Sequence, residues 1–478
     1  MAQQIILENF HNGGLASTSV QLSPNTLFRA EGFDMQSEPG ILKTSLSLVS
    51  EVANPTAIVN KILFCSDNNA YIFGNSGYLN KRTSAGTYSQ PYTTAGWSGN
   101  LMNAVEFNGY IYFCNATTLY RYQIGAANWD GITAFATFAI GNAGYHPMYV
   151  FLDQLYIGDG RYVHNVDSTN TYNSSVFDAK TPNVITSIIS NGYSLLMGTT
   201  KTNTNINSVN LYEWDMVSPN YCNMVYTVNE PIVNGMFYNG DTVLISAGYQ
   251  GSFYQLSGMR LQKIEQIQYS INSTWGYGGS RIITMQPNSF FEKDGIGHFG
   301  VSSGGATNEF SYGIYSFGNG KSGSPIILSN PYLLSELGVA ELIITACAYN
   351  QYTNTLLVAW YNAVSGDINI DAMASGGYRQ INWKIQTGWI TNNAQFGKKI
   401  KLTIPYRKCS SSYDCIGTLT NKSGTEHIFG LVKDTERNCF YTTVDADSVD
   451  SFYITFEWGS TAPNTTGLEI EKIIIDII

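Results

Sequence analysis

The chain has 478 residues, which is long enough for two or three domains with a large buried core. Only 13% of the residues are charged, whereas 46 are Gly and 33 are Tyr, which is typical of a β-rich protein with a largely uncharged surface. The net charge of −10, with only 25 Lys and Arg, argues against tight binding of nucleic acid. Because the sequence has neither a basic start with an apolar run nor 18 consecutive apolar residues, we expect a soluble chain without secretory signal or membrane contact.

The opening stretch, residues 8–43, reads ENFHNGGLASTSVQLSPNTLFRAEGFDMQSEPGILK and has no helical or strand periodicity. We expect Gly13-Gly14 and Pro39-Gly40 to reverse the chain sharply. A short helix is expected after Ser23-Pro24, where serine can cap and proline fits the first turn. Residues 1–50 are therefore interpreted as an N-terminal arm that packs on the propeller or on a neighbouring subunit and leads into the first blade. The alternative is that residues 5–10 complete the last blade or the sandwich of their own chain.

From residue 55 onward, short runs of alternating aromatic and β-branched residues follow Asn-Gly, Asn-Asn or Asp-Gly turns, which predicts β-hairpins. One hairpin phrase recurs seven times, and its first strands are centred on Ile72, Ile111, Tyr156, Leu196, Leu244, Phe299 and Leu357. The spacing of 39 to 58 residues is typical of four-stranded propeller blades. We therefore predict an all-β fold with a β-propeller of six or seven blades over residues 51–375. A set of β-sandwiches is the alternative.

The last hundred residues, 376–478, contain about seven longer strand-like runs without the blade phrase. Seven strands in this length suit a β-sandwich, with a domain boundary near Gly376. A second short helix is expected near Leu333–Leu337.

Glycines at positions 295, 297 and 300 form the pattern GxGxxG, which cradles pyrophosphate in dinucleotide-binding folds. No helix-forming run follows, so we interpret the pattern as a glycine-rich blade turn. The five histidines show no metal-binding or catalytic spacing and are expected at turns or on the surface; they are His11, His146, His164, His298 and His427. The pattern predicts no catalytic residue.

Carboxylates and thiols give no stronger signal of chemistry. The aspartates of the DADSVDS loop, Asp445, Asp447 and Asp450, are interpreted as a solvated acidic turn because the loop lacks the glycine and glutamate of an EF-hand. Cysteines in apolar runs are expected in the core, namely Cys65, Cys114 and Cys347, whereas Cys409 and Cys415 could close a hairpin loop, with Cys439 nearby. We predict no metal, no cofactor and no enzymatic activity. A glycosidase with carboxylates from distant blades is a minor alternative.

The order of these phrases resembles the tail and connector propeller proteins of tailed bacteriophages, among them the podophage tail nozzle (tail tubular) proteins. The positions that carry the resemblance, which also mark a possible arm interface, are Phe10, Gly13, Gly14, Pro24, Ala30, Gly32, Pro39, Gly40 and Leu42. The final strands, WKIQTGWI to LEIEKIIIDII, are similar to the terminal β-sandwich of that group.

This resemblance implies a virion structural protein, a subunit of a tail nozzle or connector ring that forms part of the DNA exit channel below the portal. Its implied partners are further copies of itself, with a hexamer favoured, the portal or adaptor ring, and other tail proteins. DNA is expected to pass without sticking, since acidic or neutral groups repel phosphates. The implied location is the virion tail, assembled in the host cytoplasm.

The alternative function is glycan binding, as in a phage receptor-binding or secreted lectin-like propeller. Exposed Tyr and Trp would stack on sugar faces, and Asn and Asp would bond to the hydroxyls. The recurring tyrosines Tyr120, Tyr162, Tyr212 and Tyr254 are instead expected to pack between blades.

Overall fold

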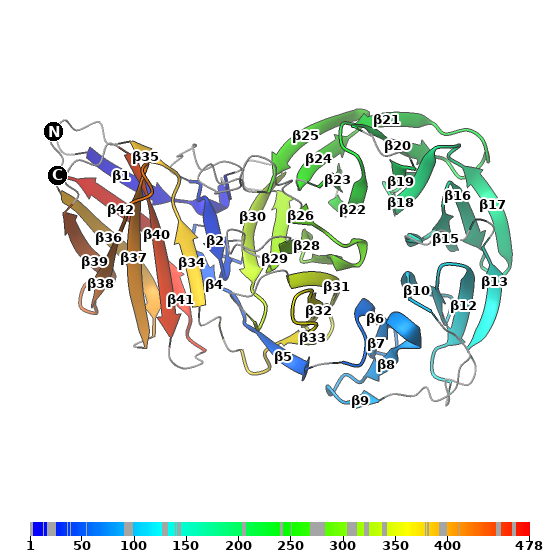
Figure 1. Ribbon diagram of the computed structural model, residues 1–478, viewed down its shortest axis with the longest axis horizontal. Helices are drawn as coiled ribbons and strands as arrows, with labels where there is room; N and C mark the ends of the chain where they lie inside the picture. The colour runs from blue at the N-terminus through cyan, green and yellow to red at the C-terminus, as the bar shows by residue number, and fades with distance from the viewer. Residues whose placement is uncertain are drawn as a thin grey trace.

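The protein is all-β in the computed structural model (Figure 1). The structure describes residues 3–12, 14–16, 25–35, 37–38, 40–53, 55–89, 99–126, 132–138, 140, 145–202, 207–239, 242–249, 251–267, 283–303, 313–319, 325–336, 342–377, 379, 382–391, 399–410, 412–445, 451–460 and 465–478. Within these residues, no helix has both the length and the apolar character that a membrane crossing requires.

Five antiparallel four-stranded sheets follow one another along the chain, each made of consecutive strands. They are β6 (Val59–Phe64), β7 (Ala70–Gly74), β8 (Leu79–Arg82) and β9 (Tyr88–Ser89); β10 (Asn103–Phe107), β11 (Tyr110–Cys114), β12 (Thr118–Gln123) and β13 (Thr133–Thr137); β14 (Met148–Phe151), β15 (Gln154–Asp159), β16 (Tyr162–Val166) and β17 (Tyr172–Asp178); β18 (Asn183–Ser190), β19 (Leu195–Lys201), β20 (Val209–Trp214) and β21 (Met224–Val228); β22 (Val233–Asn239), β23 (Thr242–Ala247), β24 (Ser252–Ser257) and β25 (Arg260–Gln266).

Two further groups of strands complete the ring of sheets in Figure 1. In the first, β27 (Phe290–Lys293), β28 (Ile296–Ser303), β29 (Gly313–Asn319) and β30 (Pro325–Tyr332) pair in serial order, and β26 (Ile283–Thr284) also pairs with β28. The second is β31 (Leu342–Asn350), β32 (Thr355–Asn362), β33 (Ile368–Met373) and β5 (Leu48–Ala53). The radial arrangement confirms the predicted β-propeller.

The recurring hairpin phrase lies at the second and third strands of each sheet. All seven central residues, from Ile72 to Leu357, are buried in the first strand of the phrase, which is the second strand of each sheet. Their hairpins have the expected tight turns: Asn108 and Gly109, for example, both have positive φ, as a type I′ turn requires. Neighbouring sheets then bury the apolar faces against each other.

The last sheet of the propeller is closed by a strand from the opposite end of the sequence. Strand β5 pairs antiparallel with β33, with Leu48 opposite Met373 and Ala53 opposite Asn369. Leu48 is buried in the core of that sheet. The ring is thus completed by an N-terminal strand.

The C-terminal strands and strands of the opening stretch are joined by strand pairing into one connected set, which β2 also links to β26–β30 of the propeller; its members outside the propeller are here called the C-terminal barrel. Its C-terminal members are β34 (Asn382–Gln386), β35 (Ile390–Thr391), β36 (Lys399–Cys409), β37 (Tyr413–Asn421), β38 (Glu426–Asp434), β39 (Cys439–Asp445), β40 (Ser451–Ser460), β41 (Leu468–Ile470) and β42 (Lys472–Ile477). Its N-terminal members are β1 (Gln3–Glu8), β2 (Arg29–Glu31), β3 (Phe33–Asp34) and β4 (Leu42–Thr44). The expected strands are present, and the sandwich arrangement stays a prediction.

The opening stretch binds the barrel to the propeller within one chain. Strand β1 pairs with β42, and β2 pairs with both β34 of the barrel and β30 of the propeller. Phe10, Ala30 and Leu42 are buried in a core shared by barrel and propeller residues. Residues 5–8 thus complete a sheet of their own chain, which is the alternative interpretation of the opening stretch, and β2 is the part that reaches the propeller.

Three glycines of the opening stretch have positive φ, namely Gly14, Gly32 and Gly40. At Gly32 the positive φ turns the chain so that both backbone groups of this residue form hydrogen bonds. Its N–H donates to the Asn330 carbonyl, and its carbonyl accepts from Ser45 N–H. The other motif positions, Gly13, Pro24 and Pro39, lie outside the described residues. The helix expected after Ser23-Pro24 was a wrong prediction, because residues 25–28 are not helical and Leu27 instead forms a bridge with Leu15 just before β2.

Short 3-10 turns are the helical segments in the described part of the chain that bear on the argument, namely η1 (Phe10–Asn12), η2 (Asn75–Gly77) and η4 (Pro287–Ser289). The helix expected near Leu333 is absent over residues 333–336, where Leu333 and Leu334 are buried in irregular backbone instead. The two adjacent leucines are both buried without a helical turn, so the cluster of apolar residues that predicted a helix reflects burial of irregular backbone instead.

Candidate functional site

An Asn or Thr lies at or near the start of the first strand in most propeller sheets, towards the centre of the ring. These residues are Asn60, Asn103, Thr186, Asn234, Asn288 and Thr345. Four of them, in β6, β18, β22 and β31, coincide with a register shift in the strand pairing. A β-bulge re-aims side chains locally. The sequence carries a signal for these positions, since an apolar residue or proline precedes each Asn or Thr, but the prediction from hairpin phrases overlooked it.

Several of these side chains bond to the backbone of the next sheet. Asn60 Nδ2 donates to the Leu101 carbonyl at 3.0 Å, and Asn103 Nδ2 donates to the His146 carbonyl at 3.1 Å. Buried amides and hydroxyls need such partners. The primary role of these groups is therefore to join neighbouring sheets near the axis.

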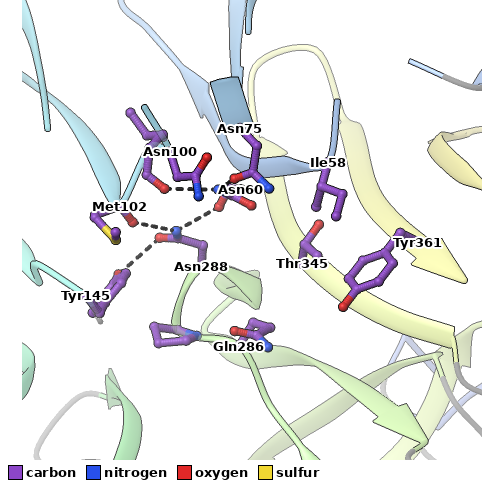
Figure 2. A pocket seen from close by; sticks show the side chains of 12 residues that line it. Ile58, Asn60, Asn75, Asn100, Met102, Tyr145, Gln286, Asn288, Thr345 and Tyr361 are labelled. Atoms are coloured by element: carbon purple, nitrogen blue, oxygen red, sulfur yellow. Dashed lines mark hydrogen bonds between the residues drawn. The ribbon is translucent and has the colours of Figure 1, made fainter. Parts of the chain in front are cut away.

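Next to this network lies a cavity of about 300 Å³, here called the axial pocket (Figure 2). Segments from five of the sheets contribute its described lining, which consists of Ile58, Asn60, Asn75, Asn100, Leu101, Met102, Tyr145, Gln286, Pro287, Asn288, Thr345 and Tyr361. Figure 2 shows Asn288 between Asn60 and Tyr145, with Thr345 and Tyr361 on the opposite side of the pocket.

Hydrogen bonds fix one wall of the axial pocket. Asn288 Nδ2 donates to the Asn60 carbonyl at 2.7 Å, and Asn288 Oδ1 accepts from Tyr145 Oη at 3.0 Å. Asn60 Nδ2 also donates to Asn75 Oδ1 at 2.6 Å. This wall is therefore pre-organised.

Lys61 lies behind that wall. Its Nζ is 3.3 Å from Asn288 Oδ1, which is its hydrogen-bond partner among the described residues. Burial lowers the pKa of this amine to about 8. The group is half-buried and is not part of the described pocket lining.

Three histidines that were expected at turns or on the surface are buried, so this prediction was wrong for His146, His164 and His298. Asp159 provides a buried polar partner for two of these histidines. Its Oδ2 accepts from His164 Nε2 at 3.3 Å, and its Oδ1 lies 3.9 Å from His146 Nδ1. Burial lowers the pKa of His146. Because sequence spacing does not show strand register, these contacts could not be foreseen. His427 is exposed, as expected.

The GxGxxG pattern is the predicted blade turn only at its first glycine, and its other two glycines lie in a strand. Gly295 has positive φ in the turn before β28, whereas Gly297 and Gly300 lie within that strand. A Cβ on Gly297 would lie 2.2 Å from Phe237 Cε2, which only a missing side chain allows. These glycines serve packing between sheets.

We assign no chemical role to the carboxylates and thiols that the sequence analysis considered. Among the described residues, no group of three or more His, Cys, Asp or Glu is placed to hold a metal ion. Asp445 ends β39, and Asp447 and Asp450 lie outside the described residues. All seven cysteines are free thiols, including Cys409 and Cys415.

The expected core cysteines and blade tyrosines are largely buried. Cys65, Cys114 and Cys347 belong to the core, and burial raises their thiol pKa values. Of the recurring tyrosines, Tyr162 is half-buried, and the others are buried in the third strands of their sheets.

The outer face of strands β37, β38 and β39 exposes large apolar side chains, here called the barrel patch. Its members are Ile416, Ile428, Val432 and Tyr441, which are 52%, 73%, 55% and 39% exposed. The strand register places them on one face, because Ile416 lies opposite Gly430 and Val432 lies opposite Tyr441. Soluble proteins usually keep such groups scattered, so a cluster indicates a contact surface.

No known family profile matches the sequence, and no curated protein sequence matches it. Among solved structures, the chain is similar to the extracellular domain of a "hybrid two component system" of B. thetaiotaomicron, with 10% identity over 90% of this chain and 57% of that one and a TM-score of 0.48. It is also similar to streptogramin B lyase, with 10% identity over 69% of this chain and 96% of that one and a TM-score of 0.43. A third similar structure is the WD40 β-propeller domain of Doa1, with 9% identity over 69% of this chain and 97% of that one and a TM-score of 0.42. We transfer no function from these similarities.

Proposed function

We propose that the protein is a structural subunit of a tailed-bacteriophage virion, forming a tail nozzle or connector ring around the DNA exit channel below the portal. The phrases of the opening stretch and of the final strands suggest this group. The serial pairing of strands favours a propeller of seven blades, and the C-terminal barrel occupies the place of the sandwich expected in the group. On this proposal the protein needs no catalytic residue, metal or cofactor.

The observation that carries the proposal is the barrel patch. Strand β38 also offers an edge, because residues 426–431 pair with β37 and no second described strand pairs with them. An exposed strand edge with apolar neighbours is a ready contact for another chain. In Figure 1 these strands lie at the end of the molecule opposite the propeller, where a neighbouring subunit has access.

A ring requires two different contact surfaces on each subunit. The second candidate is strand β1, whose residues 4–8 pair with β42 on one side and with no other described strand. A contact of the β38 edge with the β1 edge of the next copy would be head-to-tail. Such contacts close into rings when the rotation between subunits fits.

The arm of this subunit then has a mechanical role. Because β2 pairs with strands of both the barrel and the propeller, it ties the ring-forming barrel to the propeller. The net charge of −10 disfavours adhesion of DNA to the ring.

Sedimentation velocity over a concentration series, followed by negative-stain electron microscopy, tests the proposal. We expect closed rings for the native protein and monomers for the variants Ile428→Asp and Val432→Asp. The matched control is Val217→Asp, because Val217 is 81% exposed on the propeller and outside the barrel patch. A native protein that stays monomeric at high concentration, or rings that survive both barrel substitutions, would refute the proposed assembly.

A further inference from the structure

The axial pocket is lined by side chains with hydrogen-bonding groups that have no partner among the described residues. Tyr361 Oη and the side-chain amide of Gln286 have no hydrogen-bond partner among the described residues, although both residues line the pocket. Asn75 accepts through Oδ1 from Asn60, and Asn100 accepts through Oδ1 from Ser76 N–H. The Nδ2 groups of Asn75 and Asn100 have no partner in the part of the chain that the structure describes. These donors and acceptors face the pocket from different sheets (Figure 2).

The pocket chemistry selects for an uncharged ligand. None of its described lining residues is Asp, Glu, Lys, Arg or His. A carboxylate or phosphate ligand would need a cation within the pocket, since desolvating an unpaired charge is costly. The nearby Lys61 amine lies behind Asn288 and already bonds to Asn288 Oδ1.

The pocket size and its walls suit one small ring. Its volume of about 300 Å³ lies at the lower end of small-molecule sites. Amides and hydroxyls can both donate to and accept from a ligand hydroxyl, and Tyr361 and Tyr145 supply ring surface. The bonds from Asn60 to the Leu101 carbonyl and from Asn288 to the Asn60 carbonyl cross between sheets and fix the wall before binding, which lowers the entropy cost of ordering it.

We propose that the axial pocket binds one neutral, polyhydroxylated ring, the size of a single hexose unit. This places glycan recognition on the propeller axis and does not depend on the ring-assembly proposal. The unused groups of Tyr361, Gln286 and Asn75 would bond to the sugar hydroxyls.

Saturation-transfer difference NMR with glucose, galactose, mannose and N-acetylglucosamine at up to tens of millimolar tests this inference, with glucuronate as the charged comparison. We expect at least one neutral sugar to bind. Tyr361→Phe and Gln286→Ala should each weaken that binding about two- to tenfold, the worth of one hydrogen bond. The control Tyr352→Phe removes a hydroxyl from a residue that is 83% exposed and outside the pocket, and should leave binding unchanged.

Two results would overturn the inference. The first is no signal from any neutral sugar, or a signal that both pocket variants retain in full while their thermal midpoints match the native protein. The second is tighter binding of glucuronate than of glucose, which would make Lys61 the recognition group and the ligand an anion.

Discussion

Acid should destabilise the propeller through His298 in β28. This side chain is 5% exposed, and its ring stacks on Phe291 with centroids 4.9 Å apart. Its Nδ1 lies 3.1 Å from the Ile296 carbonyl, so the neutral ring donates there. Burial lowers the pKa of His298 to about 4; the charge of Lys293 adds to this effect and that of Asp34 opposes it.

The size of the effect follows from linkage between protonation and folding. The unfolded chain binds a proton at His298 near pH 6.5, whereas the folded chain does so only near pH 4. The folded-state pKa is depressed, so stability is full above about pH 6.5 and falls as the pH drops towards 4. A difference of two to three pKa units corresponds to about 3 kcal/mol in the free energy of unfolding.

Urea unfolding between pH 7.5 and pH 4.5 would measure this loss in the native protein and in His298→Asn, which keeps a donor but cannot titrate. We expect the native protein to lose about 2–3 kcal/mol more than the variant over that interval. The control His427→Asn, at an exposed position on β38, should follow the native protein. An equal loss in the native protein and His298→Asn would refute the reasoning.

Three further tests, two of them with a matched control variant, concern the packing of the core and the charge near the propeller axis. Lys61→Met should raise the thermal midpoint at pH 7, because the native protein loses stability by burying a charged amine. This gain should shrink as the pH rises from about 8 towards 10.5, where the Lys61 amine becomes neutral in the folded and then in the unfolded chain. A gain that does not change with pH would contradict the lowered pKa of Lys61. Gly417→Ala should cost about 1–3 kcal/mol by urea unfolding, since its Cβ would lie 2.1 Å from an aromatic carbon, whereas Gly430→Ala meets nothing within 4 Å and should be tolerated. Leu48→Ala should cost about 2–5 kcal/mol, and its exposed neighbour Val49→Ala much less; equal costs would mean that β5 does not pack as described.

Local turn chemistry made the repeats predictable. Pairs such as Asn108-Gly109 specify tight turns independently of the rest of the sequence. The apolar residues of the strands that such turns connect, for example Ile111, are then buried. The glycines near residue 297 were also interpretable, because no helix-forming run follows them. Alternation with a period of two and turn residues are local features of the sequence, so they can be interpreted before the fold is known.

The candidate site was not predictable, because it depends on contacts between distant segments. Asn60 and Asn288 are 228 residues apart, and only ring closure brings the Asn288 amide to the Asn60 carbonyl. Buried histidines such as His164 were missed for a different reason: Asp159 is only five residues away, but only the strand register of the β15–β16 hairpin shows that the two side chains meet. The Asn or Thr that recurs near the start of the first strands was the one available signal.

The closing strand β5 has a consequence for how the chain folds during synthesis. Its partner β33 is made more than 300 residues later, since Ala53 pairs with Asn369. Until the ribosome has produced β33, the edge of β5 has no partner in this sheet, and the ring of sheets stays open. Contacts of such separation slow folding and leave sticky edges exposed. We therefore expect translation arrested before residue 368 to yield a chaperone-dependent, protease-sensitive chain, even though the earlier sheets are complete.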